Sequence, residues 1–156
     1  MGPDGEGDVL LAAPWLHDIG YAARLRDSGF HPLDGARHLR RIGWPLRIAA
    51  LVAHHSAALS VARVRGLDEA LTEFPREESP VSDALLYADQ TIGPNGRMMT
   101  FDERLADMLN RHGPDSPNAA AHRDRQPQLY AAVRRVEHRL SAGQTDRAWR
   151  SARSSA

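Results

Sequence analysis

The chain has 156 residues, the size of one ordinary domain, and its hydrophobic fraction of 42% is enough to build a single core. It contains no cysteine, which excludes disulfides and thiolate metal sites, and its formal net charge of +0 gives no support to a nucleic-acid-binding surface. No apolar window approaches the roughly 18 to 20 residues of a membrane span. We therefore expect a cytoplasmic protein that does not contact a membrane.

Helix signals recur along the chain, whereas strand alternation and hairpin turns are nearly absent. The first predicted helix is capped by Asp8, contains Pro14, which should kink it, and ends near Gly20. Proline and glycine mark the limits of the next two helices, at Pro32, Gly43 and Pro45. Further helices are predicted over residues 67–74, 81–92, 102–111 and 128–140.

Two segments carry no clear helix pattern. Residues 113–126 are polar and contain two prolines, which predicts a loop, and the residues after 140 are rich in Ser, Ala and Arg. We therefore predict an all-α protein, with one helical domain over residues 1–140 and a flexible tail over residues 141–156.

Histidine and carboxylate side chains are the candidates for chemistry, because a chain without thiols must use imidazole and carboxylate groups to hold a transition metal. His17 and Asp18 stand side by side at the end of a hydrophobic helix. A buried Asp is costly unless it is paired or bound to a metal, so the two residues form a compact corner with two potential ligands. Taken alone, the pair is more simply explained by a local hydrogen bond and a core histidine.

Further motifs accompany this pair along the chain. They are Leu16-His-Asp-Ile-Gly20, Phe30-His-Pro-Leu-Asp-Gly-Ala36, Val52-Ala-His-His-Ser56 and Tyr87-Ala-Asp-Gln-Thr91. Together they resemble the HD family of metal-dependent phosphohydrolases, and the resemblance covers residues 8–112. It implies an HD-domain-like helical bundle that hydrolyses a phosphate ester with water activated by a divalent metal ion.

The resemblance also implies which residues bind the metal. The expected ligands are His17, Asp18, His31, His54 and Asp89. The doublet of His17 and Asp18 is the expected catalytic centre. Adjacent helix positions point about 100° apart, so His54 and His55 need not share a role. We expect His54 to bind metal and His55 to contact substrate. Manganese, iron, cobalt, nickel and magnesium are all candidates, although so many histidines argue against a site for magnesium alone.

The substrate is expected to be a small phosphorylated molecule, with nucleotides as one option. Arg24 and Arg26 follow the doublet and are candidate phosphate contacts. The double histidine is not followed by the acidic residue and Gly-Tyr-Pro run of the cyclic-dinucleotide branch, so that substrate is not assigned. The remaining histidines have no supporting context and are expected at the surface; they are His38, His112, His122 and His138.

One part of the family pattern is missing, because HD proteins carry an isolated His before the doublet and no residue before His17 is a histidine. Two explanations stay open. The natural reading frame starts further upstream, which we favour, or the chain is a catalytically impaired HD-fold module for binding or signalling. Loss of one helix from the bundle predicts an exposed apolar groove beside Leu10, Leu11 and Trp15, a candidate surface for a homodimer.

Overall fold

The structure is a computed structural model that describes residues 5–93 and 95–154, with side chains described as far as residue 144. The α-helices in chain order are α1 (Glu6–Leu16), α2 (His31–Arg41), α3 (Leu46–His54), α4 (Ala58–Arg65), α5 (Asp68–Leu71), α6 (Pro80–Thr91), α7 (Phe101–His112), α8 (Pro117–Ala120) and α9 (His122–Ser154). Short 3-10 turns are η1 (Ile19–Tyr21), η2 (Ala23–Leu25) and η3 (His55–Ala57). The described residues form no β-strand, so the predicted all-α helical bundle is confirmed.

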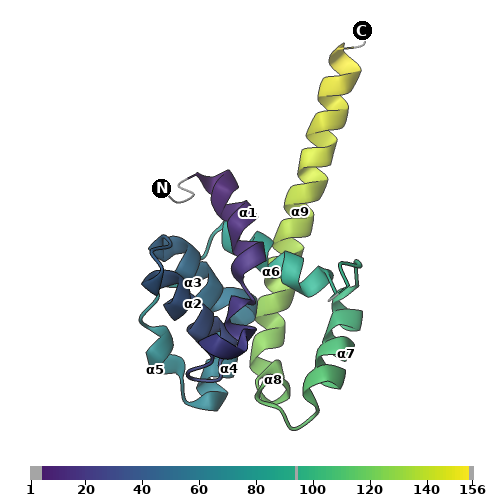
Figure 1. Cartoon of the computed structure of the whole chain (residues 1–156). Helices are drawn as coiled ribbons and strands as arrows, with labels where there is room; N and C mark the ends of the chain where they lie inside the picture. The colour runs from purple at the N-terminus through teal and green to yellow at the C-terminus, as the bar shows by residue number, and fades with distance from the viewer. Residues whose placement is uncertain (1–4, 94, 155–156) are drawn as a thin grey trace.

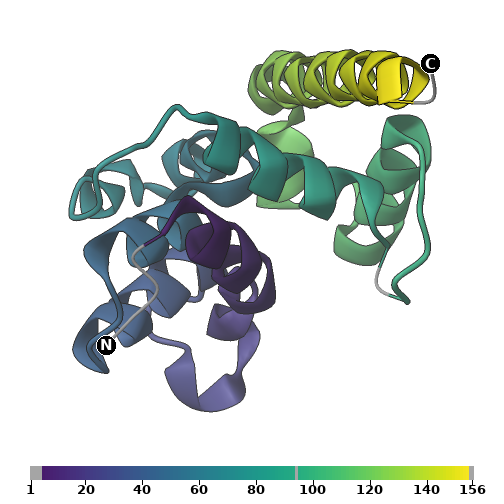
Figure 2. The same ribbon diagram turned by 90° about the horizontal axis from the view of Figure 1, so that it is seen from above.

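The bundle is built around two helix pairs, α2 with α3 and α6 with α9, and α1 packs across α3 and α6. Helix α9 runs along this body and then extends well beyond it (Figure 1), and the view from above shows it at one edge of the molecule (Figure 2). The core side chains are mainly aliphatic, and those that are essentially inaccessible are Leu33, Leu39, Ile48, Val52, Leu71 and Leu85. Each such side chain contributes about 1.5–3 kcal/mol by leaving water, so this core is the main source of stability.

Local sequence explains where several helices begin. Ser79 and Ser82 form a reciprocal capping box at the start of α6, and Thr100 and Glu103 form another at the start of α7. In each box the side chains satisfy backbone N–H groups that have no partner within the helix. Gly66 ends α4 in the left-handed conformation, with φ of 68°, which glycine adopts without steric cost.

The C-terminal third of the chain differs from the expectation. Pro117 begins the short helix α8 instead of lying in a loop, and α9 starts at His122 and contains Pro127. Helix α9 continues to Ser154, so the expected loose tail after residue 140 is helical as far as this residue. No helix in the described ranges combines the length and the apolar composition that crossing a membrane requires.

The apolar side chains of α1 lie where the sequence predicts them. Leu11 is 70% exposed and Trp15 is 88% exposed, while Leu10 is partly covered at 41%. Val9 and Ala13, on the opposite side of the same helix, are buried in the core. The predicted exposure of this face is confirmed, and the homodimer that it suggests stays a prediction.

Candidate metal centre

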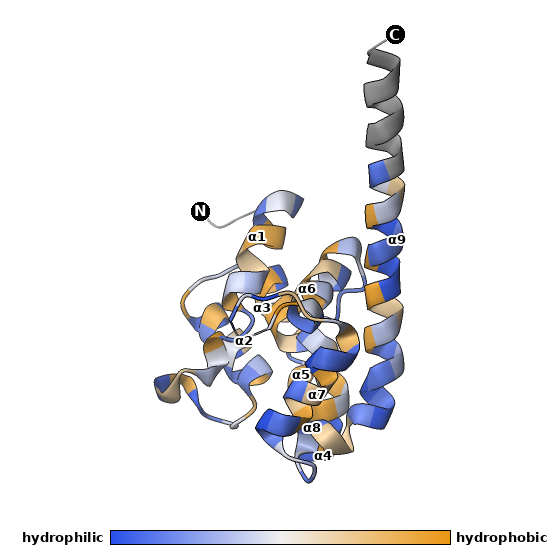
Figure 3. Ribbon diagram, turned by 90° about the vertical axis from the view of Figure 1, so that its right-hand side faces the viewer, coloured by the Kyte–Doolittle hydropathy of each residue, from blue (hydrophilic) through white to orange (hydrophobic). Residues whose placement is uncertain are grey.

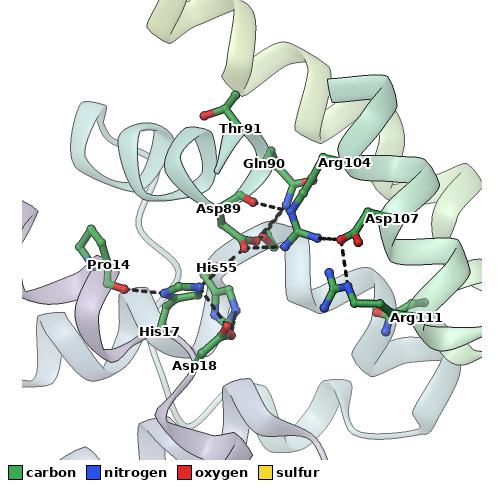
Figure 4. A network of polar contacts seen from close by, with 12 residues as sticks. Pro14, His17, Asp18, His55, Asp89, Gln90, Thr91, Arg104, Asp107 and Arg111 are labelled. Atoms are coloured by element: carbon green, nitrogen blue, oxygen red, sulfur yellow. Dashed lines mark hydrogen bonds and ion pairs between the residues drawn. The ribbon is translucent and has the colours of Figure 1, made fainter. Parts of the chain in front are cut away.

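Helices from different parts of the chain bring five polar side chains together. His17 and Asp18 follow the end of α1, and His31 is the first residue of α2. His55 opens η3, and Asp89 lies in the last turns of α6. Figure 4 shows His17, Asp18, His55 and Asp89 pointing toward one another.

The distances within this cluster are compatible with ligands around a metal ion. Nε2 of His17 lies 3.4 Å from Oδ2 of Asp18 and 3.6 Å from Oδ1 of Asp89. Oδ1 of Asp18 lies 3.3 Å from Nε2 of His31 and 3.9 Å from Nε2 of His55. In a tetrahedral site with metal–ligand distances near 2.1 Å, neighbouring ligand atoms stand about 3.4 Å apart. One donor atom each from His17, Asp18 and His55 fall within 4.8 Å of one another.

Two of the imidazole rings are oriented by the backbone. Nδ1–H of His17 donates to the carbonyl of Pro14 at 2.7 Å, and Nδ1–H of His55 donates to the carbonyl of Val52 at 2.6 Å. In a neutral ring this leaves the Nε2 lone pair free, and in both rings Nε2 is the atom that faces the cluster. Metal-binding histidines are characteristically held in this way by a hydrogen bond to the other nitrogen.

The turn that positions His55 is strained. Helix α3 ends at His54, and Ser56 and Ala57 both adopt left-handed φ values of 52°. This conformation costs a non-glycine residue about 1–2 kcal/mol. Ser56 donates its hydroxyl to Asp89, and Nε2 of Gln90 donates to Oδ2 of Asp89 at 2.9 Å. Such strain concentrates at functional sites, where the surrounding structure holds it in place.

The two neighbouring histidines occupy positions opposite to those that their expected roles would require. His55 is only 6% exposed and lies inside the cluster. His54 lies outside it, because its Nε2–H donates to the carbonyl of Phe74 at 2.9 Å. The structure therefore makes His55, and not the expected His54, the candidate ligand of this pair.

Charges in the cluster strongly perturb its titration. Burial alone would lower the pKa of His17, but Asp89 and then Asp18 outweigh this and raise that pKa to about 9. Burial lowers the pKa of His55 to about 4, assisted by the neighbouring His31. Burial would raise the pKa of Asp89, yet the hydrogen bond from His17 and the charge of His55 hold it far below its usual range. Perturbed groups gathered in this way are typical of functional sites.

The cluster opens into a cavity of about 90 Å³ whose other walls come from α7, α8 and α9. Its lining includes polar residues to which the sequence assigned no role: Tyr21, Arg104, Arg111, His112, Asn118, His122 and Arg125. His112 and His122 were expected to be incidental surface residues. Conversely, Arg24 and Arg26, the expected phosphate contacts, are exposed and neither lines this cavity.

A second, larger cavity of about 710 Å³ lies between η3, α6 and α9. Its carboxylates are already neutralised. Asp83 pairs with Arg135 at 2.6 Å and also with Arg139, and Glu77 pairs with Arg47 at 2.7 Å. These ion pairs tie helices together and leave no open set of ligands, which makes the smaller cavity the better candidate site.

Comparison with known proteins adds no assignment to this geometry. The chain matches no model of a protein family, no curated protein and no solved structure. The site must therefore be interpreted from its own residues.

Proposed function

We propose that this protein is a metal-dependent phosphohydrolase that cleaves a phosphate ester of a small molecule. The observation that carries the proposal is the cluster of His17, Asp18, His31, His55 and Asp89 beside an open cavity. The resemblance of its motifs to the HD family supports the same reaction, with His55 in place of His54.

The donor set fits a divalent transition metal. Three imidazole Nε2 atoms and two carboxylates face one another without any thiolate, a combination that suits manganese, iron, cobalt, nickel or zinc better than magnesium. The two oxygens of Asp18 face different histidines, Oδ2 toward His17 and Oδ1 toward His31 and His55. Both oxygens of Asp18 would therefore be available as ligands for a divalent metal.

A bound metal would polarise the phosphoryl group and lower the pKa of water toward about 7. The chain's own residues supply the rest. The carbonyls of Pro14 and Val52 fix the rings of His17 and His55, and Ser56 and Gln90 fix the carboxylate of Asp89. Arg104 lies on the cavity side of Asp89, with its Nη2 3.2 Å from Oδ1, and helps to hold this carboxylate in place.

The test is phosphate release from a panel of nucleoside monophosphates and sugar phosphates by metal-loaded protein. We expect turnover with Mn²⁺ or another transition metal, and a loss of at least about 1,000-fold in His17→Ala and Asp18→Asn, because removing a metal ligand removes most of the metal's contribution. His138→Ala is the matched control, since His138 is exposed on α9 away from the cavity.

Two outcomes would count against the proposal. Protein that binds no transition metal would contradict both the site and the reaction. Protein that binds metal through His17 but releases no phosphate from any substrate would leave a metal-binding module without this chemistry.

A further inference from the structure

Arg125 is a buried cation for which the described residues provide no direct ion pair, although the charge of Asp89 acts on it from nearby. It lies in the second turn of α9 and is only 7% exposed. Its Nε–H donates to the carbonyl of Ser56 at 3.1 Å, and its Nη1 makes a long contact of 3.4 Å with Oδ1 of Asn118. Both acceptors are neutral, and within the described part of the chain Arg125 forms no ion pair. Burying a charge without a directly paired counterion is costly, so a further anionic partner would stabilise this guanidinium.

The guanidinium also retains donors for such a partner. An arginine side chain carries five N–H groups in a rigid fork, and the two contacts above use only two of them. Arg125 lines the cavity that contains Asp18, His31 and Asp89. Ser56 lies between Arg125 and Asp89. Arg125 donates to the backbone carbonyl of Ser56, and the hydroxyl of Ser56 donates to the carboxylate of Asp89.

The other arginines of this cavity are already neutralised. Arg104 pairs with Asp89 at 3.2 Å and with Asp107 at 3.1 Å, and Arg111 pairs with Asp107 at 2.9 Å. Of the three arginines that line this cavity, Arg125 is therefore the one without a direct ion pair among the described residues. A cavity of about 90 Å³ is well below the roughly 300–1,000 Å³ that enclose a drug-sized ligand, so it suits one small anionic group.

We propose that Arg125 binds the phosphoryl group of the substrate and makes the site selective for a terminal phosphate, whose charge and three oxygens match the open fork. The remainder of the substrate then lies toward the mouth of the cavity. Arginine is suited to this task because its planar donors reach two phosphate oxygens at once. The identity of the anion rests on the proposed phosphohydrolase function, whereas the existence of the anion site does not.

The experiment measures binding of inorganic phosphate to the full-length protein by isothermal titration calorimetry, after the metal has been removed with a chelator. We expect Arg125→Met to weaken phosphate binding by about 10- to 100-fold, the effect of losing charge-assisted hydrogen bonds. Arg125→Lys should recover part of this affinity, because it restores the charge but not the fork. Arg123→Met is the matched control, since it removes the same charge from an exposed position on the same helix.

The alternative role for Arg125 is structural, as a support for the strained η3 turn. That role predicts a lower melting temperature in Arg125→Met with unchanged phosphate affinity, and this result would overturn the anion site, as would wild-type protein that binds no phosphate. If Arg125→Met does not fold, the phosphate affinity of Arg125→Lys decides the question. An affinity equal to that of wild type would then also overturn the site. Phosphate binding that depends on Arg125 in a protein without hydrolase activity would retain the site and reject the proposed reaction.

Discussion

At the scale of single residues, the site depends on which of two adjacent histidines turns inward. The motif around His54 and His55 predicts that at least one of them binds metal, but it does not decide between them. The decision is made by the backbone, because α3 ends at His54 and left-handed Ser56 and Ala57 reverse the chain directly after His55. Neither of these two residues is glycine, so no sequence signal marks the turn.

This pair supplies a matched mutational test. We expect His55→Ala to weaken metal binding by at least the 10- to 100-fold that is typical of losing a supporting residue, because it removes a ligand itself. His54→Ala should keep the metal affinity and lose only about 1 kcal/mol of stability with its hydrogen bond to Phe74. Metal content after dialysis, measured by mass spectrometry, compares the two, and greater loss in His54→Ala would reverse the assignment.

Asp34 is a buried carboxylate that organises the loop before α2. It is 2% exposed and accepts hydrogen bonds from the backbone N–H groups of Asp27, Ser28 and Gly29, at 3.2, 2.9 and 3.1 Å, and from the Ser28 hydroxyl at 2.7 Å. Burial would raise the pKa of Asp34, but these hydrogen bonds outweigh it and lower the pKa below its ordinary value. The ionised form therefore stabilises the fold and holds His31 at the start of α2.

We expect Asp34→Asn to lower the free energy of unfolding by about 2–3 kcal/mol at pH 7, because an amide offers one oxygen where the carboxylate offers two. The folded pKa lies below the unfolded value of about 3.9, so this stabilisation is complete above about pH 5 and is lost as the pH falls through the folded pKa. Urea unfolding at several pH values tests this. The difference between wild type and Asp34→Asn should shrink toward pH 3, and a difference that grows on acidification would reject the explanation.

At the scale of elements, proline and glycine show what sequence patterns can locate. Pro32 and Pro45 mark the starts of α2 and α3 as predicted, since a fixed φ favours the first turn. Pro117 was interpreted as a loop residue, yet it begins α8, and α9 starts at His122, before Pro127 and before the predicted start at residue 128. A proline in residues 113–126 fits a loop and a helix start equally well. The choice between these two structures depends on tertiary packing, here that of α9 against α6.

Gly20 controls how η1 packs against α2. A Cβ atom built at Gly20 would lie 2.0 Å from the carbonyl oxygen of His31 and 2.7 Å from the backbone nitrogen of Gly35. Both neighbours are backbone atoms and cannot move aside cheaply. The first motif therefore needs its glycine for this close approach, which joins the segment carrying Asp18 to the helix carrying His31.

We expect Gly20→Ala to destabilise the fold by at least about 1–3 kcal/mol, the usual cost of overpacking, and to reduce metal binding because His31 is displaced. Gly7→Ala is the matched control. It lies in the first turn of α1 with no heavy atom within 4 Å of the added Cβ, and it should stabilise the helix by about 0.5–1 kcal/mol. Thermal melts of both variants measure the effect. A melting temperature of Gly20→Ala equal to that of Gly7→Ala would exclude the proposed clash.

At the scale of the whole molecule, the motifs predict more of the site than helical periodicity does. His17, Asp18, His31 and Asp89 were expected together from motifs, and the structure brings them together over a long stretch of sequence. Arg104 and Arg125 were not expected. They lie on α7 and α9 outside any motif, and their place in the cavity follows only from how these helices fold back over α6.

Because α1, α2, η3 and α6 all contribute to one cluster, a bound metal should stabilise the whole bundle. An ion present at 100 times its dissociation constant adds about 2.7 kcal/mol to the free energy of unfolding. For a domain of this size that corresponds to a rise of about 5–10 °C in melting temperature. We expect Mn²⁺ or Zn²⁺ to produce this rise in chelator-treated wild type and in His138→Ala, and EDTA to reverse it. His17→Ala should show no rise, because Nε2 of His17 contacts both Asp18 and Asp89. A rise equal to that of wild type would place the metal outside this cluster.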